Sequence, residues 1–266
     1  MKPLLHPQLT YAVRGVLFDV RQQLDLMLPE KYYQDAIAIG LENAGIPCQT
    51  EKQFDVTYRG VQVGRYAVDV WIDEGKLLLE LKVAPRIEAI HQAQAISYLK
   101  VTDADLALVV NFGEIPLGIQ PIPNLLRQQQ PEFQWQRQPM PADQELLYPE
   151  LAGRMLQILH RVHFELGPGF LHQVYRRATM VELRQQEVGY RYLKTVPVYY
   201  RDHFLGDQPV RLIHVEEAIL LATVAVKEID ETLRFYFRGR MKEQKVQLGI
   251  IANFHYEKLN VVFERV

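Results

Sequence analysis

The sequence has a single cysteine, no long apolar run and almost no net charge, and each shortage excludes a class of protein. Cys48 is the only cysteine among 266 residues, so neither an internal disulfide nor a cysteine-based zinc site can form. No apolar run reaches the roughly 18–20 residues of a membrane-spanning helix. The first residues carry two prolines and no apolar segment of the signal-peptide kind. These features predict a cytoplasmic protein without a membrane span.

The formal net charge of −2 gives no overall indication of nucleic-acid binding, which a strongly basic chain would give. It is divided unevenly: residues 1–120 have 11 Lys and Arg against 15 Asp and Glu, whereas residues 148–266 have 17 against 14. The acidic half would suit a divalent cation and the basic half a phosphate backbone. Ordinary surface variation explains so small a difference equally well.

The chain contains the same unit twice. A shift of 142 positions superposes the two halves without a gap, and so long a register indicates a tandem duplication. Pairs of identical residues in this register include Tyr33 and Tyr175, Ala36 and Ala178, Leu41 and Leu183, Lys52 and Lys194, Gly64 and Gly206, and Asn111-Phe112 and Asn253-Phe254. We predict one unit at 1–115 and another at 148–266. Between them, repeated proline predicts an extended linker at 116–147, because proline blocks continuous helix and sheet.

Hydrophobic periodicity predicts an α/β unit in the order ααβββαβ. In the first copy, helices are expected at about 9–25, 29–44 and 87–101. Strands are expected near 52–59, 61–72, 76–83 and 105–112.

Residues 66–83 place three ionic side chains in two apolar runs that flank the turn-like residues 73–75. Asp69 lies in the first run. Glu80 and Lys82 lie in the second and are two residues apart, so they share one face of the predicted strand. Ionic groups on a largely buried sheet are costly unless they pair or bind a metal. This stretch is therefore a candidate site, with a cross-strand ion pair as the alternative.

Further polar candidates lie on the predicted helices. Gln94 and Tyr98 are four residues apart and share a helix face, with His91 three residues before Gln94. Glu30 lies in the first turn of its helix, where a carboxylate also favours the helix dipole. A solvated polar helix face is the alternative for Gln94 and Tyr98.

The pattern Asp69…Glu80-Leu81-Lys82, followed by His91-x-x-Gln94-x-x-x-Tyr98-Leu99, resembles the PD-(D/E)xK nuclease superfamily. Within it, the chain is similar to the bacterial group called the GxxExxxR proteins. The second copy carries the leading signature of that group in Glu165-Leu166-Gly167-Pro168-Gly169-Phe170-Leu171, then His172 and Tyr175-Arg176, with His172 in place of the signature glutamate. The resemblance covers each repeat almost from end to end. It implies two tandem restriction-endonuclease-like units, each with a mixed central sheet flanked by helices.

The resemblance also implies a nuclease that hydrolyses the phosphodiester bonds of nucleic acid, with DNA as the expected substrate and Mg²⁺ or Mn²⁺ as cofactor. Asp69, Glu80 and the backbone carbonyl of Leu81 would hold the cation. Glu30 would add a carboxylate, directly or through water. Lys82 would orient the attacking water or stabilise the pentavalent phosphate.

Gln94, Tyr98 and Lys100 would contact the substrate in this scheme. Gln94 and Tyr98 would do so by hydrogen bonds to a phosphate or to the nucleophile.

The two copies depart from the family pattern in different ways. The first keeps the signature glutamate as Glu30, but Met27 and Gln34 replace the glycine and the arginine. In the second copy, the 142-residue offset places Arg211, Ala222 and Val224 opposite Asp69, Glu80 and Lys82. That copy cannot perform the chemistry and would serve structure or substrate binding.

Two units in one chain predict a monomer that forms an internal pseudo-dimer. A non-catalytic module of the same fold, which binds nucleic acid or protein, remains the alternative function. Metal titration separates the two, because a working site should bind Mn²⁺ through Asp69 and Glu80.

Overall fold

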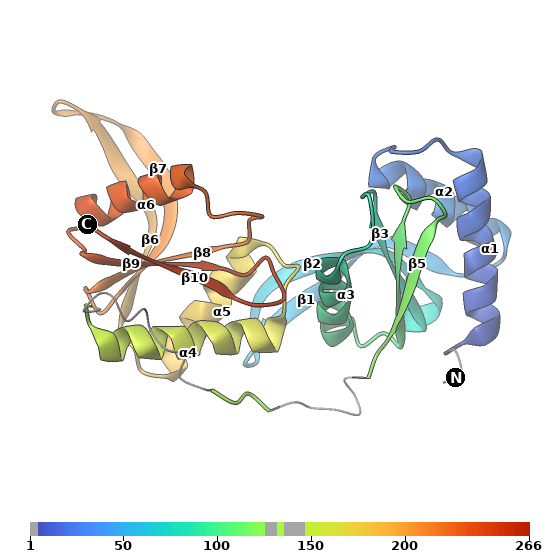
Figure 1. Ribbon diagram of the computed structural model, residues 1–266, viewed down its shortest axis with the longest axis horizontal. Coiled ribbons are helices and arrows are strands. Elements are labelled where there is room, and N and C mark those ends of the chain that lie inside the picture. Colours follow the sequence, from blue (N-terminus) through green and yellow to red (C-terminus); the bar gives the residue numbers. More distant parts are fainter. Residues whose placement is uncertain (1–4, 126–131, 136–146) are drawn as a thin grey trace. The chain divides into compact units, whose positions relative to one another are not determined.

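The structure is a computed structural model, and it describes residues 5–125, 132–135 and 147–266 (Figure 1). By its contacts the chain divides into two compact units. The first consists of Met1–Thr57, Gly64–Glu132 and Gly167–Gly169, and the second of Tyr58–Val63, Phe133–Leu166 and Phe170–Val266. Within the described ranges, no helix combines the length and the apolar character that crossing a membrane requires.

The first unit is a five-stranded sheet with helices on both faces. Its elements are α1 (Pro7–Gln23), α2 (Glu30–Asn43), β1 (Cys48–Tyr58), β2 (Val61–Ile72), the 3₁₀ turn η1 (Asp73–Gly75), β3 (Leu77–Lys82), α3 (Ala89–Thr102), β4 (Leu106–Asn111) and β5 (Gly118–Pro123). The strand order is β1-β2-β3-β4-β5. The β3–β4 pair is parallel, whereas β2–β3 and β4–β5 are antiparallel. The predicted α/β class with a mixed sheet is confirmed.

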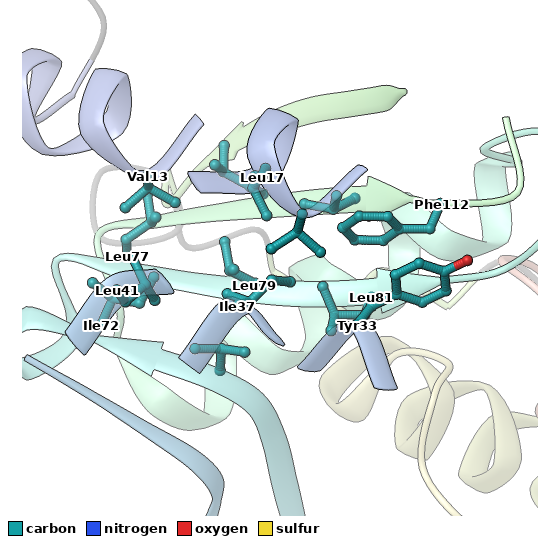
Figure 2. Packing of buried hydrophobic residues seen from close by; sticks show 14 of the residues in the cluster. Val13, Leu17, Tyr33, Ile37, Leu41, Ile72, Leu77, Leu79, Leu81 and Phe112 are labelled. Atoms are coloured by element: carbon teal, nitrogen blue, oxygen red, sulfur yellow. The ribbon is translucent and has the colours of Figure 1, made fainter. Parts of the chain in front are cut away.

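Apolar side chains alternate between two cores on the two faces of this sheet. On one face, α1 and α2 contribute Val13, Leu17 and Ile37, which pack against strand residues such as Leu79 and Leu81 (Figure 2). On the other face, α3 packs against Leu78, Ala107 and Val109. Burial of each large aliphatic side chain stabilises the fold by roughly 1.5–3 kcal/mol. The sheet is therefore buried on both faces, and an ionic group on it needs a compensating partner.

The second unit repeats this arrangement. Its elements are α4 (Pro149–Leu166), α5 (His172–Gln185), β6 (Tyr190–Tyr200), β7 (His203–Val215), β8 (Ile219–Val224), α6 (Glu231–Glu243), β9 (Leu248–Asn253) and β10 (Asn260–Arg265), with strand order β10-β9-β8-β7-β6. The same buried stack recurs at the 142-residue offset. Tyr33 lies 4.2 Å from Phe112 between ring centroids, and Tyr175 lies 4.4 Å from Phe254. The structure thus supports the duplication.

Each unit has one strand more than the sequence predicted. Gly118–Pro123 falls in the stretch assigned to the linker, yet it pairs with β4 as the edge strand β5. Proline blocks the centre of a sheet but is tolerated at an edge, where one side of the strand needs no partner. The expectation that proline excludes sheet was therefore wrong for these residues. Of the rest of the predicted linker, residues 126–131 and 136–146 lie outside the described part of the chain.

The 142-residue register is also interrupted once. In the first unit Val70 pairs with Leu79, whereas in the second Ile213 pairs with Leu221. Leu79 and Leu221 are 142 residues apart, but Val70 and Ile213 are 143 apart. The additional residue belongs to an irregularity of β7 where Arg211 takes a left-handed backbone, with φ of 56°. Such a one-residue insertion is a β-bulge.

The bulge changes which residue replaces Asp69. Leu212, not Arg211, has the equivalent place in the sheet, and Leu212 is buried. The positions of Glu80 and Lys82 are unaffected, because β3 and β8 keep the 142-residue offset. The counterparts of the three ionic residues are therefore Leu212, Ala222 and Val224. The conclusion that the second unit lacks the ionic set is unchanged.

Candidate active site

The candidate site is built on the β2–β3 hairpin. The turn η1 connects the two strands, and Gly75 in it has φ of 99°. A Cβ at Gly75 would collide with the Trp71 ring, so glycine is required here for both conformation and space. The tight turn fixes the antiparallel register that brings the end of β2 beside β3.

The alternation of faces along β2 breaks at Asp69. Val68 packs into the core beneath α3, whereas Val70 packs into the opposite core beneath α1 and α2. Residues two apart on a regular strand would share a face. Around this break, Tyr66 bonds the Glu80 carboxylate of β3, and Asp69 accepts from the Leu81 backbone amide of the same strand.

Glu80 is 4% exposed, and both of its carboxylate oxygens have donors. Lys82 Nζ lies 2.6 Å from Glu80 Oε1, and the Tyr66 hydroxyl donates to Oε2 at 2.8 Å. Burial by itself would lower the pKa of Lys82, but the adjacent Glu80 carboxylate raises it above its usual value. Lys82 is therefore a cation at neutral pH. Glu80 and Lys82 lie together on one face of β3, as the two-residue spacing predicted.

Asp69 forms hydrogen bonds with residues of β3 and α2. Its Oδ2 accepts a hydrogen bond of 2.7 Å from the Leu81 amide, and its own carbonyl accepts one of 2.7 Å from Gln34 Nε2. Burial, followed by repulsion from Glu80, raises the pKa of Asp69 to about 7; the Leu81 amide and Lys82 oppose this rise. Near neutral pH, the surrounding groups therefore do not fully stabilise the negative charge of ionised Asp69.

The helix α3 supplies the polar residues above this pair. Tyr98 stacks on Tyr66 with 3.7 Å between ring centroids, and the amide oxygen of Gln94 is buried without a hydrogen-bond partner in the described residues. Lys100 is exposed, and its position two residues from Tyr98 points it to a different side of the helix. His91 closes the first turn of α3 by accepting from the Glu88 amide at 3.1 Å.

A divalent cation fits the chemistry of these donors, which are hard carboxylate and carbonyl oxygens. Glu30 Oε1 accepts from the Val83 amide at 3.3 Å, next to Lys82 in sequence. In residues 5–125, 132–135 and 147–266, no three His, Cys, Asp or Glu side chains form a ready-made metal group. The protein ligands of a cation would thus be the Asp69 and Glu80 carboxylates and the Leu81 carbonyl. The Leu81 carbonyl lies on the same side as the Leu81 amide that bonds Asp69, because N–H and C=O of one strand residue point toward the same neighbour.

Sequence reasoning missed three supports of the site. Tyr66 binds Glu80, and Gln34 binds the Asp69 carbonyl. Asn111 is fully buried, and its side chain both accepts from the Ala84 amide at 2.9 Å and donates to the Ala84 carbonyl at 2.8 Å. This pair of bonds fixes the chain directly after β3. The identity of Asn111 and Asn253 was the available signal for that role.

Comparisons with known proteins found a similar solved structure and a matching family model. The chain is similar to a solved structure titled "Crystal structure of SSO0001", with 17% identity over 45% of this chain and 55% of that one, and a TM-score of 0.27. No curated protein matches. The family described as the PD-(D/E)XK nuclease superfamily matches residues 7–121 and again residues 149–266. Together these two matches cover most of the sequence, and the chain belongs to the PD-(D/E)XK nuclease superfamily, with one member of the family in each unit.

Proposed function

We propose that the first unit is a Mg²⁺- or Mn²⁺-dependent nuclease and that Asp69, Glu80 and Lys82 are its catalytic residues. The observation that carries this proposal is that the buried Glu80 carboxylate, the partly buried Asp69 carboxylate and the Lys82 ammonium group lie close enough to interact at the β2–β3 hairpin. Each of these groups is expensive to bury, and the raised pKa of Asp69 indicates a site that a bound cation would stabilise. The family match to residues 7–121 supports the same assignment.

Asp69, Glu80 and the Leu81 carbonyl would hold the cation, with Glu30 contributing through water. The bound cation would neutralise charge on the phosphate and lower the pKa of a water molecule. The pKa of Asp69 is about 7, so a proton competes with the cation at this carboxylate. Affinity for the cation should accordingly increase between about pH 6 and pH 8.

Lys82 would stabilise the negative charge that develops on the phosphate. Its raised pKa keeps it protonated, so it acts as an electrostatic group and not as the base. The unpaired amide oxygen of Gln94 would accept a hydrogen bond from the attacking water. Tyr98 is fixed by its stack on Tyr66, and its hydroxyl donates to the Gly169 carbonyl at 3.1 Å, so it would have to exchange that bond to hold a phosphate oxygen. Lys100 would contact the nucleic-acid backbone farther from the scissile bond.

Metal-dependent cleavage of single- and double-stranded DNA, with RNA in parallel, tests the proposal. We expect Lys82→Ala and Asp69→Asn each to reduce the rate by about 10²–10³-fold or more. The matched control is Lys76→Ala, which removes an exposed lysine of the same hairpin. Its rate should equal that of the wild type. Cleavage by Lys82→Ala at the rate of the Lys76→Ala control would refute the assignment.

A non-catalytic role has one observation in its favour. Both oxygens of Glu80 are already bonded, to Lys82 and Tyr66, as in a structural ion pair. Binding of Mn²⁺ by calorimetry distinguishes the alternatives, because a structural pair has no affinity for the cation. Loss of Mn²⁺ binding in Asp69→Asn, with no loss in Lys76→Ala, would exclude the non-catalytic role.

A further inference from the structure

The second unit contains a cavity of about 500 Å³ at the place that corresponds to the candidate active site of the first unit. Three of its lining residues are Leu212, Ala222 and Val224, the counterparts of the catalytic residues. The volume is in the range of pockets that bind small molecules. Where the first unit has three ionic side chains, the second unit therefore has a cavity large enough for a ligand.

The charge of this cavity is opposite to that of the site in the first unit. His172, Arg176, Arg211 and Arg240 line it, and no aspartate or glutamate is among its described lining residues. His172 replaces Glu30 and Arg176 replaces Gln34 at the 142-residue offset. A wall that offers cations without carboxylates selects an anion.

Two of the arginines are not neutralised by an acid. Arg240 pairs with Glu243 at 2.7 Å, but no described carboxylate forms an ion pair with Arg176 or Arg211; Arg176 hydrogen-bonds the Tyr192 side chain instead. Arg176 is only 6% exposed, and its guanidinium lies 5.7 Å from the centroid of the Tyr192 ring. A buried guanidinium without a carboxylate is costly, and an anion in the cavity would offset that cost.

The cationic groups are close enough to influence one another. Burial lowers the pKa of His172, and Arg176 and Arg211 lower it further. Burial also lowers the pKa of Arg176, and Arg211 adds to that effect. Two guanidinium groups that repel each other across a small space match a dianion better than a monoanion, and planar guanidinium binds phosphate oxygens in pairs.

The other walls are apolar and aromatic. Val210, Leu233 and Phe237 line the cavity, and Tyr236 presents an exposed ring at its edge. These surfaces would contact the uncharged part of a ligand, and a tyrosine ring is a suitable surface for stacking a base. An inorganic anion alone would leave them without a partner.

We propose that this cavity binds a phosphate monoester attached to a nucleoside, with Arg176 and Arg211 on the phosphate and the aromatic residues beside the base. The monoester has two sources, a free nucleotide or the 5′ end of a nucleic-acid strand. This site differs from the metal site of the first unit in its residues and in the sign of its charge. Binding in this cavity does not depend on nuclease activity of the first unit.

Calorimetric titration of the full chain in EDTA tests the proposal, because chelation keeps divalent cations away from the first unit. Adenosine 5′-monophosphate should bind and adenosine should not. A 5′-phosphorylated oligothymidylate that binds more tightly than the mononucleotide identifies a strand end as the ligand, and the reverse order identifies a free nucleotide. Failure of both phosphorylated probes to bind, or equal binding of the 5′-hydroxyl oligonucleotide, would overturn the proposal.

The variants assign the binding to this cavity. Arg211→Ala removes an exposed guanidinium, so it should fold normally and weaken nucleotide binding by about tenfold or more. The control is Arg201→Ala, another exposed arginine with a left-handed backbone, φ 53° against 56°, which is not among the cavity residues. It should bind as the wild type does. Equal affinity of the two variants would show that the nucleotide binds elsewhere.

Discussion

Replacing Asp69 by asparagine should stabilise the first unit at neutral pH in the absence of metal. The pKa of Asp69 is about 7 in the folded chain against its usual value of 3.8, so the folded state retains a proton that the unfolded state has released. For an acid whose folded pKa is raised, the free energy of unfolding falls as pH rises through this window. Asparagine keeps an oxygen for the Leu81 amide but has no charge to bury.

The magnitude follows from linkage at 1.36 kcal/mol per pKa unit. Between pH 5 and pH 8 the wild type should lose about 3 kcal/mol relative to Asp69→Asn, and the full difference cannot exceed about 4 kcal/mol. The raised pKa of Lys82 does not contribute, because Lys82 stays protonated over this whole range. Stability differences of this size are readily measured.

Urea denaturation followed by Trp71 fluorescence measures the effect. The chain has two tryptophans, so the Trp135→Phe background leaves Trp71, on β2 beside the site, as the reporter of the first unit. The control is Asp55→Asn, because Asp55 is half exposed and its pair with Arg65 contributes at most about 1 kcal/mol. A difference between wild type and Asp69→Asn that is the same at pH 5 and pH 8 would refute the reasoning.

Two further predictions concern the supports of the site. Tyr66→Phe keeps the ring stack but removes the hydroxyl that binds Glu80. The free energy of unfolding of the first unit should therefore fall by about 1–2 kcal/mol in the same urea assay. An unchanged free energy of unfolding would contradict the role of this bond. Asn111→Ala and Asn253→Ala each remove the side-chain partner of three backbone groups, so each should cost about 2 kcal/mol or more and raise amide hydrogen exchange in its own unit. An effect in one unit only would show that the two asparagines differ in role.

The fold was largely predictable because the strong signals are local or repeated. Alternation of apolar residues predicted the main strands, and the 142-residue offset predicted the second unit from the first. The strand β5 was missed because Pro121 and Pro123 are permitted only at an edge, and sequence does not reveal which strand is at the edge. The bulge at Arg211 was missed because an additional residue in β7 is compensated by a turn one residue shorter.

The site was predictable where the strand is regular and not where it is irregular. Glu80 and Lys82 were grouped correctly, since two-residue spacing on β3 puts them on one face. Tyr66 and Asp69 are three residues apart, and a regular strand would place them on opposite faces. The strand is irregular between Val68 and Val70, where Tyr66 bonds Glu80 and Asp69 bonds the Leu81 amide, and no local sequence signal marks that break.

The duplication itself distinguishes residues that the fold needs from residues that the site needs. Asn111 and Asn253 make the same pair of backbone hydrogen bonds in their two units, so the fold explains their identity. At the positions of Glu80 and Lys82 the second unit has Ala222 and Val224 in an equivalent strand, and its sheet forms without any ion pair there. An ion pair that the same sheet can omit is not required for folding. Its presence in the first unit therefore supports the proposed role of Glu80 and Lys82 in binding a cation and a phosphate.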